Sequence, residues 1–206
     1  MSTNQAEFYR GLEVASHALR DPALSPSDQA TAVHQAVQPL LDDTDHLGQL
    51  ACRLGCSHCC KYPVGVTYPE ATRLAEALQS QPELVERVLR EQAQLSELPW
   101  ESLVGHACPL LIDDACSVHQ DRPMPCRALG SLNEEACADA LVTDRAPPRD
   151  EQAWWRGLGA ATKLATLNTH GSRELRSAVS AILAAGTNEP EQAFIKARTA
   201  PGSEME

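Results

Sequence analysis

Apolar side chains recur at helical spacing over most of the chain. Residues 5–20 form one such segment, which ends at the helix-breaking pair Asp21–Pro22. A second helix is expected from about residue 25 to about residue 50, with Ser25 or Ser27 as its N-cap and Pro39 as a kink or a division. The apolar positions of these two segments are Phe8, Leu12, Ala15 and Leu19, then Ala32, Val33, Ala36, Val37, Leu40, Leu41 and Leu47.

Helical patterns continue after the middle of the chain. Pro69 and Pro82 suit the first positions of two helices, and Gly186 suits a C-terminal cap. A short β-branched run at 64–67 is expected to be extended, although it cannot make a sheet alone. The further helices are expected over residues 69–80, 82–95, 151–170, 173–185 and 190–198.

Residues 106–150 break this pattern, because they are rich in proline and have little periodicity. Alanine and leucine dominate the composition and aromatic residues make up only 4 %, which favours helices over a strand-rich fold. We therefore expect a mostly α fold, with helices bracketing an irregular, cysteine-rich metal-binding centre. The expected division is N-terminal helices over 1–50, a cysteine-cluster domain over 51–140, C-terminal helices over 141–200 and a frayed tail over 201–206, with the three main parts in one compact unit.

Cysteine clustering is the strongest chemical signal. All eight cysteines lie in two sets between residues 52 and 137, and four of them fall within nine residues. Thiols that only fill core space have no reason to crowd in this way, whereas thiolates are the ligands that zinc and iron–sulfur centres prefer. The candidate metal ligands are Cys52, Cys56, Cys59 and Cys60 in the first set, and Cys108, Cys116, Cys126 and Cys137 in the second.

The cofactor is either an iron–sulfur cluster or zinc. Two four-thiolate zinc sites use all eight thiols, whereas one 4Fe–4S cluster uses four and leaves four for other roles. Two neighbouring cysteines rarely direct both thiolates at one tetrahedral ion. The pair Cys59–Cys60 therefore favours a polynuclear centre, or two different roles for these thiols, with zinc as the close alternative.

The cysteines have two other interpretations, which fit the chain less well. Four disulfides suit small secreted domains, but this chain is larger and its N-terminus lacks the pattern of a secretory signal. The C-x3-C-x2-C spacing of Cys52, Cys56 and Cys59 also occurs in radical S-adenosylmethionine enzymes. Those enzymes need a β/α barrel, and this chain lacks the repeated strand–helix alternation.

Residues 52–78 and 108–137 together resemble the CxxCxxCC cysteine-cluster family, whose members are described as zinc- or iron-chelating proteins. The resemblance rests on the first cysteine set, on VGVTYPEA with Glu70, on CPLL at Cys108, and on the later CSV, RP and CR pieces. It covers about residues 48–138 and implies metal chelation without implying a reaction. Two departures are an x3 gap between Cys52 and Cys56, and His119 where an aromatic residue is common.

The net charge and the hydropathy of the chain argue against some classes of binding partner. The formal net charge is −11, which repels nucleic acid and anionic membrane surfaces, and no apolar stretch reaches the length of a membrane span. The expected partner is thus a metal ion or cluster, with no nucleic acid and no membrane. The expected location is the cytoplasm, where thiols stay reduced.

Three histidines near the cysteines, His58, His106 and His119, are the candidate nitrogen ligands, and Arg127 is a candidate donor to a ligand sulfur. The leading function is cytoplasmic metal binding by cysteine thiolates. The alternatives are a redox or group-transfer enzyme that uses an open-site iron–sulfur cluster, and an adaptor protein with a structural zinc site.

Overall fold

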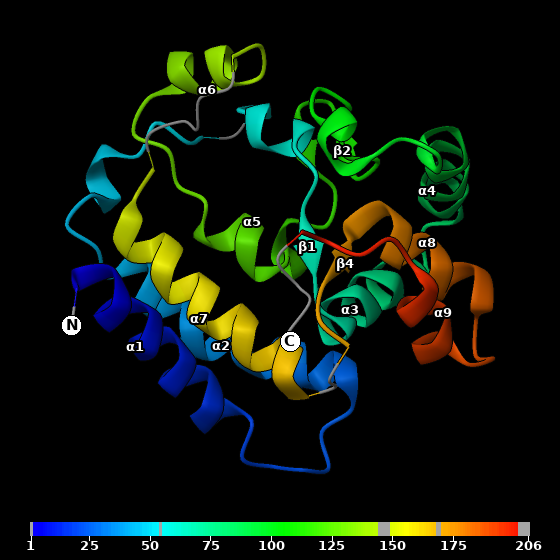
Figure 1. Cartoon of the computed structure of the whole chain (residues 1–206), viewed down its shortest axis with the longest axis horizontal. Helices are drawn as coiled ribbons and strands as arrows, with labels where there is room; N and C mark the ends of the chain where they lie inside the picture. The colour runs from blue at the N-terminus through cyan, green and yellow to red at the C-terminus, as the bar shows by residue number, and fades with distance from the viewer. Residues whose placement is uncertain (1, 54, 144–148, 168–169, 202–206) are drawn as a thin grey trace.

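Helices dominate the computed structural model, which describes residues 2–53, 55–143, 149–167 and 170–201 (Figure 1). The expected mostly α fold is confirmed. Within the described residues the α-helices are α1 Thr3–Ala18, α2 Pro26–Asp42, α3 Tyr68–Leu78, α4 Pro82–Leu95, α5 Met124–Ala128, α6 Glu134–Ala140, α7 Glu151–Leu167, α8 Leu175–Ala185 and α9 Pro190–Lys196. The shorter elements are the 3-10 helices η1 Leu47–Gln49, η2 His58–Lys61, η3 Trp100–Leu103 and η4 His119–Asp121, and the strands β1 Gly65–Val66, β2 Leu111–Ile112, β3 Ala115–Cys116 and β4 Arg173–Glu174.

One hydrophobic core lies where α1, α2, α5 and α7 pack together. Helices α1 and α7 lie against each other along their length, as Figure 1 shows. Their approach needs glycine, because a Cβ at Gly11 would overlap the carbonyl oxygen of Arg156, and a Cβ at Gly159 would overlap that of Phe8. The buried side chains of this core are Ala15, Val33, Val37, Leu41, Met124, Ala128, Ala153, Ala160 and Leu164.

A second hydrophobic core joins α3, α4, α8 and α9. The rings of Tyr68 and Phe194 meet in it, with their centroids 5.4 Å apart. Leu110 and Val118 enter the same core from the cysteine-rich segment, and the sulfur-bearing residues Cys108 and Cys116 pack against it. The apolar residues that alternate with these cysteines thus attach the segment to the helices.

The buried carboxylate of Glu70 connects three parts of the chain. One of its oxygens accepts hydrogen bonds from the backbone N–H (3.0 Å) and the hydroxyl (2.8 Å) of Thr67, which caps α3. The other oxygen accepts a 2.6 Å bond from the backbone N–H of Met124, the first residue of α5, and lies 3.6 Å from His34 Nε2 on α2. Burial by itself would raise the pKa of Glu70, but His34 and these backbone donors outweigh burial and lower the pKa. Glu70 therefore fixes the start of α5, the helix that carries Cys126.

The small sheets link the cysteine segment to distant residues. Strand β1 lies within the run expected to be extended, and it pairs antiparallel with β4, so that Gly65 lies opposite Glu174. Strands β2 and β3 form a hairpin whose turn residues Asp113 and Asp114 have φ values of 48° and 57°, as a type I′ turn requires. The Asp114 carboxylate accepts a 2.7 Å hydrogen bond from the Ser57 hydroxyl and so ties the hairpin to the first cysteine set.

Several predicted boundaries need correction. The second helix ends at Asp42 and not near residue 50, with Pro39 inside its last turn, and Leu47 lies in the separate turn η1 with 47 % of its surface exposed. Residues 173–174 form β4, so the helix expected from 173 begins at Leu175. The irregular segment 106–150 contains short elements from β2 to α6, but residues 144–148 lie outside the described part, as do 202–206 of the expected tail.

Substitution of Glu70 tests its role in stability. The variant Glu70→Ala leaves the buried N–H groups of Thr67 and Met124 without their acceptor, which costs about 2–4 kcal/mol of unfolding free energy. Urea denaturation measures the loss, and Glu76→Ala, at an exposed position of the same helix, is the matched control. Equal stability of the two variants would contradict the assigned role.

Candidate metal centre

The first cysteine set is held by backbone hydrogen bonds around η2. Cys56 N–H donates to Arg53 O at 3.0 Å, and Cys60 N–H donates to Ser57 O at 3.0 Å, which closes the 3-10 turn. A 3-10 helix has three residues per turn, so successive side chains project about 120° apart. This geometry sends His58, Cys59 and Cys60 in three directions from one short turn.

The second cysteine set comes from four separate places. Cys108 lies in the loop before β2, Cys116 ends β3, Cys126 lies in α5 and Cys137 lies in α6. The backbone N–H of Cys108 donates a 2.7 Å hydrogen bond to Cys60 O, which joins the two sets directly. The whole set of eight is described by the structure, and each is a free thiol, so the disulfide alternative finds no pair here.

Four cysteines, which we call the α5 group, influence one another's ionisation: Cys60, Cys108, Cys116 and Cys126. Burial raises the pKa of Cys108 to about 11 and raises that of Cys126 well above its ordinary value, and the negative charges of neighbouring thiolates add to both effects. The charges acting on Cys126 include those of Cys108 and Cys116, and the charges acting on Cys60 include those of Cys108 and Cys126. Without metal these thiols are therefore neutral, and a cation that replaced their protons would relieve the repulsion between thiolates.

Backbone amides point at several of the sulfurs. The sulfur of Cys108 accepts a hydrogen bond from the N–H of Leu110, and that of Cys116 accepts one from the N–H of Val118, in each case two residues later. Cys56 has the same relation to His58, and Ser131 N–H donates to Cys52 Sγ at 3.2 Å. Such bonds lower the thiol pKa because they favour the charged form. They are also among the contacts that tune thiolate-bound metal centres.

Two arginines contribute positive charge to the α5 group. Arg122 lowers the pKa of Cys59, Cys116 and Cys126, and Arg176 lowers that of Cys108. Arg176 is almost fully buried, where it pairs with the buried Glu174 at 2.9 Å and donates to His106 O at 2.6 Å. The sequence pattern placed Arg176 only in a helix and gave no signal of this role.

Arg127 does not have the expected role as a donor to sulfur. Its guanidinium donates to the carbonyl oxygens of Arg122 (2.6 Å) and Gln120, and to Gln38 Oε1 (3.1 Å). It therefore shapes the loop between η4 and α5 and attaches this loop to α2. Arg127 donates to oxygen because carbonyl and amide oxygens within reach are better hydrogen-bond acceptors for a guanidinium than a thiol is.

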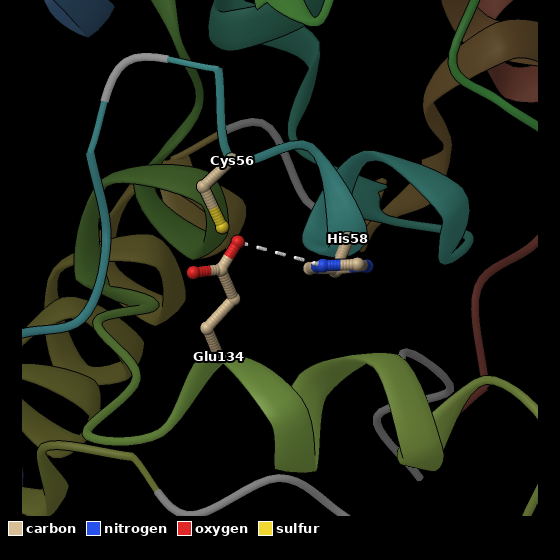
Figure 2. A group of neighbouring side chains, drawn as sticks. All are labelled: Cys56, His58 and Glu134. Atoms are coloured by element: carbon tan, nitrogen blue, oxygen red, sulfur yellow. Dashed lines mark ion pairs between the residues drawn. The ribbon is translucent and has the colours of Figure 1, made fainter.

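A second set of side chains, which we call the α6 group, gathers where α6 packs against η2: Cys52, Cys56, Cys137, His58 and Glu134. One ligand atom each from Cys56, His58 and Glu134 lies within 4.8 Å of the other two (Figure 2). Ser131 hydrogen bonds to Cys52 through its backbone N–H and to Cys137 through its side chain, so these two thiols flank one residue. Burial raises the pKa of Cys56, and the charges of Cys52 and Glu134 raise it further.

Cys59 lies between the two groups. Its charge raises the pKa of Cys56 and Cys137 in the α6 group, and of Cys60, Cys116 and Cys126 in the α5 group. The thiols of Cys59 and Cys60 are hydrogen bonded, which lowers the pKa of Cys59 and raises that of Cys60. The adjacent cysteines Cys59 and Cys60 thus differ in their environment, which is compatible with the two different roles considered for this pair.

Among the three candidate histidines, the described structure places only His58 in a group of metal-ligating side chains. His106 and His119 are exposed. Partial burial and the charges of Arg122 and Arg127 lower the pKa of His119. Glu134 was not predicted, although its spacing of three residues from Cys137 places both on one face of a helix.

Comparison with protein families matches the cysteine-rich segment to a metal-chelating domain. Residues 51–142, which include all eight cysteines, match the model of the CxxCxxCC family, described as a "Putative zinc- or iron-chelating domain". Neither the curated proteins nor the solved structures that were compared include a match. The radical S-adenosylmethionine interpretation is wrong, because the described residues form a helical fold and not a β/α barrel. No helix in the described part of the chain has the length and apolarity needed to cross a membrane.

Proton release tests the ionisation of the α5 group. The raised pKa values of Cys60, Cys108 and Cys126 leave these thiols protonated at pH 7, so metal binding must displace their protons. Adding zinc to metal-free, reduced protein in weak buffer at pH 7 should release about one proton for each ligating thiol, and the apparent affinity should rise with pH. A pH indicator measures the release, and zinc uptake without any proton release would contradict the prediction.

Proposed function

We propose that this protein binds metal through its cysteine segment and that the α5 group holds an iron–sulfur cluster. Its thiols come from η2 and from three other chain segments: the loop at Cys108, the hairpin strand at Cys116 and helix α5 at Cys126. Their charges act on one another's ionisation. The observation that carries the proposal is the pair of backbone N–H bonds to Cys108 and Cys116, each donated by the residue two positions later. Directed amide donors around a cluster of buried thiols stabilise thiolates, and thiolates are what such a centre requires.

The adjacent pair Cys59–Cys60 supports a cluster over a single zinc ion, because two neighbouring thiolates rarely reach one tetrahedral ion. A 4Fe–4S cluster and a zinc ion each need four thiolates, so Cys59, whose charge acts on the α5 group, is a fifth thiol in either case. Arg122 and the buried Arg176 offer positive charge to a thiolate cluster. A four-thiolate zinc site is the second candidate, since four of these thiols suffice to close it and the protein would then be a structural adaptor.

An enzyme remains the alternative of a different class. Its support is the exposure of Cys59, whereas the thiols of the α5 group are half-buried, because a solvent-accessible thiol next to a cluster suits redox or group-transfer chemistry. A ligand-sensitive optical spectrum of the purified protein would favour this enzyme, because such a spectrum requires an open coordination position.

The cytoplasm is the proposed location. Eight free thiols within one segment need a reducing environment to remain available for metal. Expression of the chain in an oxidising compartment should therefore lower its metal content.

Metal analysis of matched cysteine variants tests the proposed function. Protein purified without oxygen should be brown and contain iron with acid-labile sulfide, and Cys126→Ser should lose most of both. Cys52→Ser is the control, because Cys52 lies in the α6 group and should leave the cluster in place.

The possible outcomes separate the candidates. A colourless protein with zinc and no sulfide would exclude the cluster and support the zinc adaptor. Unchanged metal content in Cys126→Ser would contradict metal binding by the α5 group altogether.

A further inference from the structure

The α6 group has the donor set of a separate site. Its sulfur, nitrogen and oxygen donors come from Cys56, His58 and Glu134, and Figure 2 shows the thiol and the imidazole near the same oxygen of the carboxylate. Glu134 Oε1 lies 3.9 Å from His58 Nε2, and the Nδ1 atom of the same ring is buried without a hydrogen-bond partner among the described residues. An ion bound at Nε2, the nitrogen that faces Glu134, would fix the orientation of this ring.

Glu134 is oriented by Arg53. The guanidinium of Arg53 lies 2.5 Å from Glu134 Oε2, which leaves Oε1 directed at His58. Carboxylate ligands of metal ions are commonly held in this way by an outer hydrogen-bonding partner. A surface ion pair with Arg53 would account for the contact at Oε2. It would not account for the positions of Cys56 and His58 near the other carboxylate oxygen, Oε1.

Cys52 is the candidate for a fourth donor, although its sulfur lies outside the set of three ligand atoms that are all within 4.8 Å of one another. Its sulfur already accepts the Ser131 N–H at 3.2 Å, and its charge is the foremost among those that act on Cys56. Two thiolates and one carboxylate carry three negative charges. A divalent ion together with Arg53 supplies three positive charges, so the site would be neutral as a whole.

We propose that the α6 group binds a single zinc-type divalent ion through Cys52, Cys56, His58 and Glu134, separately from the centre in the α5 group. Mixed sulfur, nitrogen and oxygen ligation suits zinc, whereas harder cations avoid thiolate and softer ones avoid carboxylate. Bonds of about 2.0–2.3 Å around a tetrahedral ion place ligand atoms about 3.4–3.8 Å apart. The three donors, now within 4.8 Å, therefore need to close by only about 1 Å. The proposal rests on the proposed function only in assuming that the cysteine segment binds metal.

The test uses the full chain and two pairs of variants. His58→Gln and Glu134→Gln remove ligands of the α6 group. His119→Gln and Glu135→Gln are matched controls, since both residues are exposed and Glu135 is the neighbour of Glu134 on the same helix. Zinc content is measured by elemental analysis, and zinc affinity by competition with a chromophoric chelator.

The ligand variants should each lose about one zinc per chain and bind zinc more than about tenfold more weakly, which is the lower limit seen for loss of even an outer-shell partner. The controls should match the wild type. Iron and sulfide in the α5 group should be unchanged in all four variants, so the result does not depend on the nature of that centre.

A rescue variant distinguishes the loss of a metal ligand from misfolding of the variant protein. His58→Cys restores a thiolate ligand, so it should recover zinc binding, and X-ray absorption at the zinc edge should show one more sulfur and one fewer nitrogen than in the wild type. Wild-type zinc affinity in both His58→Gln and Glu134→Gln would overturn the proposal. The Cys126→Ser variant separates this proposal from the proposed function. Loss of iron and sulfide in Cys126→Ser would support the proposed function even if the zinc proposal failed. Retention of that metal in Cys126→Ser would count against the proposed function and not against the zinc proposal.

Discussion

The buried carboxylate of Glu70 is the contact on which the arrangement of the cysteine segment depends most. It caps α3 through Thr67, accepts the first N–H of α5 at Met124, and lies beside His34 of α2. A charged group without solvent is tolerated only where such donors surround it. Because α5 carries Cys126, the contact that stabilises the junction between the two hydrophobic cores also places one thiol of the α5 group.

In our proposals the short turn η2 divides the first cysteine set between two metal sites. Its three residues per turn direct His58 toward α6, while the charges of Cys108 in the loop and Cys126 in α5 act on Cys60. Neighbouring residues in the sequence can therefore serve centres of different chemistry: an all-thiolate site with two arginines, and a mixed site with a histidine and a glutamate. One metal ion needs only four thiols, and a division of the cysteines between two sites would account for the other four.

Local signals in the sequence were sufficient for most helices, but not for the pairing of distant residues. Ser25, one of the two N-caps that the sequence offered, caps α2, and α3 starts at Tyr68, one residue before the predicted start at Pro69, with Thr67 and Glu70 as its cap. The early end of α2 was missed because helical spacing continued past Asp42 to Leu47, which is largely exposed in the separate turn η1. The pairing of β1 with β4, and the meeting of Glu134 with His58, depend on how distant segments pack, which periodicity along the chain does not encode. The cysteine spacing indicated metal binding, but the division into an α5 group and an α6 group required the fold.

Anomalous diffraction from crystals grown without oxygen tests the central claim, metal binding by the α5 group, most directly. The account predicts an anomalous peak at bonding distance, about 2.3 Å, from the sulfurs of Cys60, Cys108, Cys116 and Cys126, with the wavelength dependence of iron. A peak with the wavelength dependence of zinc would retain the site and change its metal. Four well-ordered thiols with no anomalous peak among them, or any two of them joined as a disulfide, would contradict the account.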